Sequence, residues 1–120
     1  MATRYMVHDV DASVAFYRDQ LGMILEEQWG PAMAIMSFGD ERLWLAGPIS
    51  SAAKPMPDGR TPEPGGWNRI VLEVDNFDEL VDKLRVGGAT FRNEPISGPG
   101  GRQVLVEDPS GNCIELFSSH

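Results

Sequence analysis

The chain has 120 residues, of which 42% are hydrophobic and 23% charged, and its formal net charge is −8. This balance is typical of one globular domain and excludes a chain that is disordered throughout. No apolar run approaches the roughly 20 residues that cross a bilayer, and the acidic balance argues against nucleic acid and anionic membranes as partners. The first residues lack the apolar core of a signal peptide. With a single cysteine, Cys113, we expect a cytoplasmic protein without an internal disulfide.

The first half of the chain predicts one helix among four strands. Asp11 is the expected N-cap of the helix, and Gly22 suits the left-handed position at which the helix ends. Val14, Tyr17 and Leu21 lie at helical spacing on one face. The predicted strands are residues 3–7, 23–28, 32–38 and 42–46, the second of them placed only loosely.

The second half repeats this order. Asn76 and Glu79 resemble a capping box at the start of a helix, and Gly87 with Gly88 ends it. Residues 108–111, Asp-Pro-Ser-Gly, form a turn between the last two strands. The predicted strands are residues 68–74, 90–93, 103–107 and 113–117, the second again placed loosely.

Residues 50–66 separate the two halves and contain four of the nine prolines. A loop of this length is either functional or a linker. We therefore expect a single α+β domain, residues 1–120, with one βαβββ module in residues 1–49 and another in residues 67–120. The two modules form a curved mixed sheet with helices on one face and a cleft on the other.

The aligned halves predict which side chains leave the core. Side chains alternate along a strand, so Leu43 and Leu45 face the helix whereas Trp44 faces the other way. Glu115 is the matching residue of the second half. The same open face carries Arg4, Met6, Arg69, Val71 and Glu73. A tryptophan among these charges favours a cleft or an interface over a simply solvated face.

Two segments carry a resemblance to a known family. Residues 7–22 contain Ser13-x-x-Phe16-Tyr17 followed by Leu21-Gly22, and residues 106–116 contain Asp108-Pro109-x-Gly111-x-x-x-Glu115. Both resemble the vicinal oxygen chelate superfamily, which includes glyoxalase I, extradiol dioxygenases and fosfomycin- and bleomycin-resistance proteins. The resemblance covers the whole chain and implies the doubled βαβββ fold. It says little about function, because this fold hosts many activities.

The metal enzymes of that superfamily take one ligand from each of four strands. The resemblance places these positions at Ala2, Trp44, Arg69 and Glu115. Alanine and tryptophan offer no suitable lone pair, and arginine stays protonated. Glu115 alone would not hold a transition metal, so we expect neither a metal site nor another cofactor. The resemblance also implies that the four positions converge, so that Arg69 meets Glu115 where relatives hold the ion.

The resemblance therefore favours the non-metal binding branch, whose bleomycin-type members hold a drug without transforming it. The hypothesis is a protein that sequesters a planar aromatic compound, such as an antibiotic or other natural product, for self-resistance or transport. No residue is assigned a catalytic role. The candidate ligand-binding residues are Trp44, Arg69, Glu115, Met6, Val71, Glu73, Phe117 and Trp67.

Two alternatives stay open. One is a metal-dependent glyoxalase-like lyase or isomerase, or a dioxygenase, and the other is a metal-free enzyme with Glu115 or Glu73 as base. Trp67 could instead anchor the linker, and neither Trp29 nor His8 receives a role.

We also expect a homodimer with two equivalent clefts. Related chains of this size form two-fold dimers, and residues 50–66 supply the reach for pairing one half with the other half of a partner. Whether the modules pair within a chain or across the dimer stays open at this point.

Overall fold

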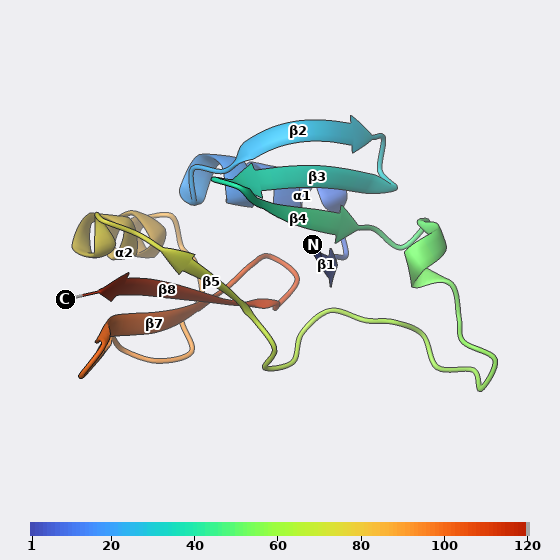
Figure 1. Ribbon diagram of the computed structural model, residues 1–120. Helices are drawn as coiled ribbons and strands as arrows, with labels where there is room; N and C mark the ends of the chain where they lie inside the picture. Colours follow the sequence, from blue (N-terminus) through green and yellow to red (C-terminus); the bar gives the residue numbers. More distant parts are fainter. Residues whose placement is uncertain (120) are drawn as a thin grey trace.

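Each half of the chain folds into a four-stranded sheet of the same strand order in the computed structural model, which describes residues 1–119. The orders are β1-β4-β3-β2 and β5-β8-β7-β6, with β1 parallel to β4, β5 parallel to β8 and the remaining pairs antiparallel. The α+β class and the tandem βαβββ modules are thus confirmed (Figure 1). The strands of the first sheet are β1 (Thr3–Met6), β2 (Ile24–Trp29), β3 (Met33–Phe38) and β4 (Glu41–Ala46), and those of the second are β5 (Ile70–Glu73), β6 (Ile96–Gly98), β7 (Gly101–Glu107) and β8 (Cys113–Ser119).

The first helix is capped by a different residue than expected, and the second begins at the expected residue without the expected capping hydrogen bond. Helix α1 (Val10–Ala15) is capped by Asp9, whose carboxylate accepts a hydrogen bond from the Ala12 N–H at 3.0 Å, so Asp11 is not the cap. It continues into a π-helical turn, η1 (Phe16–Gln20). Helix α2 (Phe77–Val86) starts after Asn76, but the Asn76 side chain makes no capping hydrogen bond. The expected capping box is therefore not formed.

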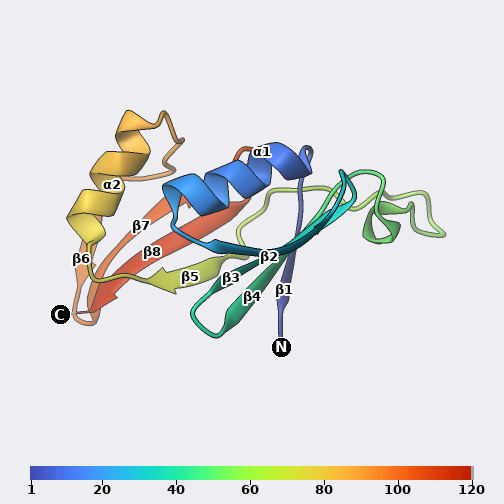
Figure 2. The ribbon, with the colours of Figure 1, turned by 90° about the horizontal axis from the view of Figure 1, so that it is seen from above.

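The edge of the second sheet lies elsewhere than predicted. Residues 90–93 contain only one isolated bridge, Phe91 to Val106, and β6 supplies the edge strand instead. The tight β6–β7 hairpin closes at Gly101, where a Cβ atom would overlap the Ser118 carbonyl oxygen. Between the modules, the loop extends away from the sheets (Figures 1 and 2) and contains one short 3₁₀ turn, η2 (Ser51–Ala53).

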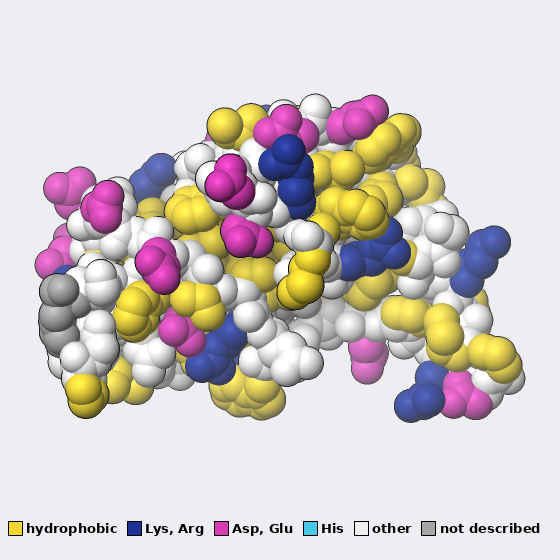
Figure 3. All heavy atoms as spheres, in the orientation of Figure 1, with side chains coloured by type: hydrophobic (Ala, Val, Ile, Leu, Met, Phe, Trp, Pro, Cys, Tyr) yellow, Lys and Arg dark blue, Asp and Glu magenta, His cyan; other side chains and the backbone are white. Residues whose placement is uncertain are grey.

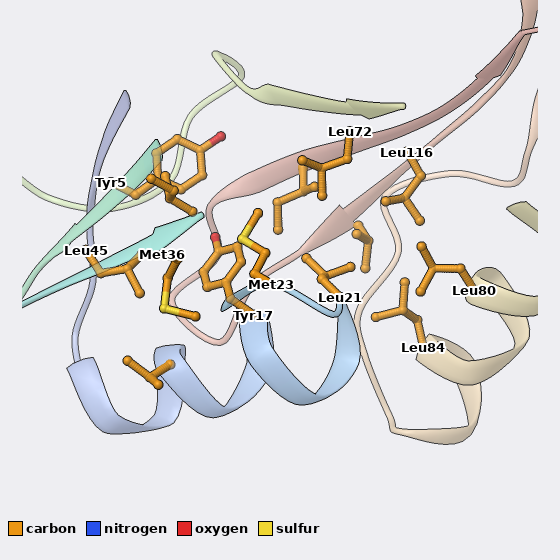
Figure 4. Close-up of a cluster of buried hydrophobic side chains, with 14 of the residues drawn as sticks. Tyr5, Tyr17, Leu21, Met23, Met36, Leu45, Leu72, Leu80, Leu84 and Leu116 are labelled. Atoms are coloured by element: carbon orange, nitrogen blue, oxygen red, sulfur yellow. The ribbon is translucent and has the colours of Figure 1, made fainter. Parts of the chain in front are cut away.

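The helices lie together on one side of the two sheets (Figure 2). Between the helices and the sheets lies one cluster of buried apolar side chains, which come from both modules (Figure 4). Leu43, Leu45, Ile114 and Leu116 belong to it, as their alternation predicts. The opposite faces of both sheets are left free of helices. No helix within residues 1–119 has the length and apolar character that crossing a membrane requires.

A buried polar network joins the two modules through the β7–β8 turn. Tyr17 donates from its hydroxyl to Asp108 Oδ2 at 2.7 Å, and the Asn112 amide donates to the same oxygen and to the Met6 carbonyl. The Tyr5 hydroxyl donates to the Cys113 carbonyl at 2.6 Å and accepts from the Ile70 N–H. A turn read from sequence as a local feature is therefore the main polar contact between the halves.

Both tyrosines of the chain lie in this network. Burial raises the pKa of Tyr5 to about 12, and burial together with the Asp108 charge raises the pKa of Tyr17 well above its usual value. The folded protein thus holds the Tyr5 proton to higher pH than the unfolded chain does. The stabilisation from this hydroxyl is complete below pH 10 and is lost as the pH rises toward 12.

We therefore expect no tyrosinate absorbance from the native protein near pH 10, and a rise only when the protein unfolds at higher pH. An ultraviolet pH titration, with circular dichroism recorded alongside, tests this. Tyr5→Phe and Tyr17→Phe assign the signal to each ring. Reversible ionisation of either tyrosine near pH 10 in the folded protein would contradict the network.

Candidate functional site

The open face of the second sheet is built around an ion pair. Nε and Nη2 of Arg69 both lie 3.0 Å from Glu115 Oε1, so the predicted contact between these residues is present. Glu115 is 8% exposed, although it sits on the face away from the helices. A carboxylate this buried needs a partner, and the guanidinium supplies it.

The other second-module candidates surround this pair on the same face. Strand register places Val71 beside Glu115 and Glu73 beside Phe117. Val71 is 52% exposed, whereas Phe117 is half-buried. Val71 and Glu73 also line a pocket of about 360 Å³ at the seam with the first module, together with Thr3, Phe38, Arg42 and Leu43 among other residues.

Trp44 lies on the open face of the first sheet, where Arg4 is its neighbour on β1. The Arg4 guanidinium carbon is 5.0 Å from the centre of the indole ring, a cation–π contact. A pocket of about 580 Å³ adjoins them, lined by Met1, Ala2, Arg4 and Trp44. Met6 follows Arg4 on this face of β1 and is half-buried.

Trp67 is placed at the end of the linker by Arg92. The Arg92 guanidinium stacks 4.5 Å from the Trp67 ring centre and bonds Glu107, the Gly66 carbonyl and the Gly111 carbonyl. Trp67 nonetheless stays 69% exposed. It lines a pocket of about 510 Å³ with Gly66, Phe91, Arg92 and Glu107. The geometry fits an anchor of the linker and leaves room for a ligand beside the ring.

The predicted site residues thus fall into three groups within one chain. The pocket beside Trp44 is lined only by residues of the first module, and Glu115 does not line it. The convergence of Trp44 and Glu115 in one cleft stays a prediction, and it requires that a second chain contribute one of the two residues. Cys113 is buried, and burial raises the pKa of its thiol, so it is suited to packing and not to nucleophilic attack.

The residues at the four family positions do not fit a metal ion. Ala2 and Trp44 offer no donor, and Arg69 presents a cation that is already bonded to Glu115. Within residues 1–119 no group of three or more His, Cys, Asp or Glu side chains is placed to hold an ion. Divalent transition metals need three or four such ligands.

Two arginines make contacts at the candidate site that the sequence did not indicate. Arg4 appeared only as one of several face residues, but it covers one face of the Trp44 ring. Arg92 fell in a segment predicted as strand and instead joins the linker, β7 and the β7–β8 turn. The alternation of Arg4 with Tyr5 could have placed Arg4 beside Trp44, since the halves had already been aligned.

The chain is similar to known proteins over nearly its whole length. Residues 2–116 match the model of the Glyoxalase/Bleomycin resistance protein/Dioxygenase superfamily. A lactoylglutathione lyase of Salmonella typhimurium is 27% identical over 126 residues, covering 98% of this chain and 90% of the relative.

Two solved structures share the fold. A superfamily member from Sphaerobacter thermophilus has a TM-score of 0.73 and 26% identity, covering 99% of this chain and 97% of that one. TnmS3, an antibiotic binding protein from Streptomyces sp. CB03234, has a TM-score of 0.71 and 23% identity, covering 100% and 96% of the two chains. With its doubled βαβββ architecture and the full-length match, the chain belongs to the Glyoxalase/Bleomycin resistance protein/Dioxygenase superfamily.

Proposed function

We propose that this chain belongs to the non-metal branch of its superfamily and binds a planar aromatic compound without a metal ion. The observation that carries the proposal is the Arg69–Glu115 pair. It occupies two of the four family ligand positions with a neutralised ion pair, while Ala2 and Trp44 occupy the other two. A site with an indole and an ion pair at the family's metal-ligand positions is suited to binding a ligand and not to Lewis-acid chemistry.

The likeness to TnmS3 supports a binding role. TnmS3 is named an antibiotic binding protein, and the two chains share the fold over their whole lengths. At 23% identity the two chains share a fold, and the particular ligand of TnmS3 is not transferred. It supports an antibiotic or other natural product as the class of compound to try first, in a role of self-resistance or transport.

The proposal includes a homodimer. Trp44 and the Arg69–Glu115 pair lie on the open faces of two different sheets, and a two-fold dimer that pairs the first module of one chain with the second module of its partner joins them in each cleft. Sedimentation equilibrium at micromolar protein tests this. A species at the chain mass of 13.2 kDa would refute the shared cleft.

The main alternative is a metal-dependent lyase, favoured by the 27% identity with a lactoylglutathione lyase. Elemental analysis separates the two functions. After dialysis against Ni²⁺ or Zn²⁺ and desalting, we expect no stoichiometric metal. About one ion per chain, lost in Glu115→Ala, would support the alternative.

We expect Trp44→Ala to weaken the binding of a planar aromatic antibiotic about tenfold, or about 1.4 kcal/mol. The indole adds stacking to the area it buries, a contribution of roughly 0.5–1.5 kcal/mol. Because Trp44 is half-buried at the sheet surface, the variant folds normally. Calorimetric titration across a panel of such antibiotics, with wild type and variant side by side, gives the comparison.

Trp29→Ala is the matched control, since Trp29 is 48% exposed at the end of β2 and lines neither the Trp44 pocket nor the Trp67 pocket. It should bind as wild type does. A confirmed ligand that binds Trp44→Ala as tightly as wild type would show that Trp44 does not line the cleft.

A further inference from the structure

The distribution of ion pairs singles out the face that carries Trp44. Within residues 1–119 six ion pairs employ six arginines, and the two remaining arginines of the chain are Arg4 and Arg42. Both lie on β1 or β4 of the first sheet. Arg4 is the strand neighbour of Trp44, and Arg42 precedes Trp44 by two residues on β4. In a chain of net charge −8, Arg4 contacts the Trp44 ring without an acidic partner, whereas Arg42 lines the pocket at the seam of the modules with Glu41 and Glu73.

Side-chain alternation puts Arg42 and Trp44 on the same face, because Leu43 between them is buried among the core residues. The space-filling view shows Lys or Arg side chains beside hydrophobic and Asp or Glu ones over the first sheet (Figure 3). The two lysines lie elsewhere, Lys54 after η2 and Lys83 on α2. The cation that contacts Trp44 is therefore Arg4.

The hydrogen-bond donors of the Arg4 side chain are available to a ligand. A cation–π contact holds a guanidinium by its charge and does not use up its five N–H donors. The Arg4 guanidinium carbon lies 5.0 Å from the Trp44 ring centre, and its N–H groups have no acceptor among residues 1–119. Arg4 and Trp44 line the pocket of about 580 Å³, and its other lining residues, Met1 and Ala2, are apolar.

We propose that Arg4 recognises a carboxylate on the aromatic ligand, so that the ligand of this site is a planar aromatic acid. This inference rests on the proposed function and specifies the class of its ligand. A carboxylate matches the fork of N–H donors and gains a charge-assisted bond. The aromatic body of the ligand then lies against Trp44 and the apolar wall. The Arg69–Glu115 pair is already neutral and adds no competing charge.

The test compares two probes of nearly the same shape, naphthalene-2-carboxylate and naphthalene-2-carboxamide. Wild type should bind the carboxylate at least tenfold more tightly than the amide by calorimetry. Arg4→Gln should remove this preference, so that the variant binds the two probes equally, and Arg4→Lys should restore part of it. Added NaCl should weaken the carboxylate complex and spare the amide complex, since Arg4 is solvent-exposed.

Arg60→Gln is the matched control, because it removes the same charge from an exposed linker residue that pairs with Asp58. It should keep the full preference for the carboxylate. Equal affinity of wild type for the two probes, or a preference that survives Arg4→Gln, overturns the inference and leaves the aromatic binding function standing. If wild type binds neither probe, the proposed aromatic site fails together with the inference.

Discussion

Asp108→Ala should lower the free energy of unfolding by about 4 kcal/mol, the largest effect we expect of a single change. Asp108 is 4% exposed and accepts four hydrogen bonds on its two carboxylate oxygens. The donors are the Tyr17 hydroxyl, the Ser110 and Asn112 N–H groups and the Asn112 amide. Alanine leaves these donors without an acceptor in a site that is largely buried. The melting temperature should fall by roughly 15 °C for a chain of this size.

Two variants separate lost hydrogen bonds from lost charge. Asp108→Asn keeps the shape and one acceptor oxygen, so it should cost less than alanine. Asp82→Ala removes an exposed carboxylate from α2 and should stay within about 0.5 kcal/mol of wild type. Urea titration of the three variants gives the comparison. A loss for Asp108→Ala no larger than for Asp82→Ala would mean that the turn does not join the modules.

The repeat within the sequence predicts most of this fold, because the alternation of apolar residues reports which face of a strand is buried. Leu43 and Leu45, with Ile114 and Leu116, point into the shared core as expected. The point at which the first helix begins was harder to predict from the sequence. Asp9 and Asp11 are both plausible caps by residue type, and only the path of the backbone after β1 selects Asp9.

The edge strand of the second sheet shows a different limit. Residues 90–93 look strand-like, but they contribute one bridge, and β6 is set by its hairpin with β7. Edge strands are short and bury little apolar surface, so their hydrophobic pattern is weak. The hydrogen-bond network between the modules could not be predicted from the sequence for another reason. Tyr17 and Asp108 are 91 residues apart in sequence, and no local pattern joins them.

The contacts of the candidate site were likewise predicted only in part. The family resemblance implied that Arg69 meets Glu115, and the two side chains form an ion pair. The alignment could not reveal that Arg4 covers the Trp44 ring, because a cation–π contact depends on side-chain rotamers and not on strand register. Likewise, the contact between Trp67 and Arg92 depends on the path of the linker, which the sequence does not predict.

Arg69→Leu should lower the free energy of unfolding by about 2 kcal/mol, since it strands the buried Glu115 carboxylate without a partner. Loss of one partner from a fully buried pair costs about 3–5 kcal/mol, and the 33% exposure of the Arg69 side chain reduces that cost. The double variant Arg69→Leu/Glu115→Leu removes both charges and should return to within about 1 kcal/mol of wild type. Urea titrations of the single and double variants measure the coupling between the two residues.

Arg60→Leu provides the surface comparison, because the Arg60 and Asp58 side chains are 85% and 52% exposed although their N–O distance is only 2.7 Å. Its effect should stay below about 0.5 kcal/mol, since exposed ion pairs contribute little. A double variant as unstable as Arg69→Leu would show that the pair itself, and not the isolated carboxylate, stabilises the sheet. If the double variant is stable, it also tests function: a folded protein without the pair that still binds its aromatic ligand assigns recognition to Trp44 and Arg4, whereas loss of binding assigns it to the ion pair.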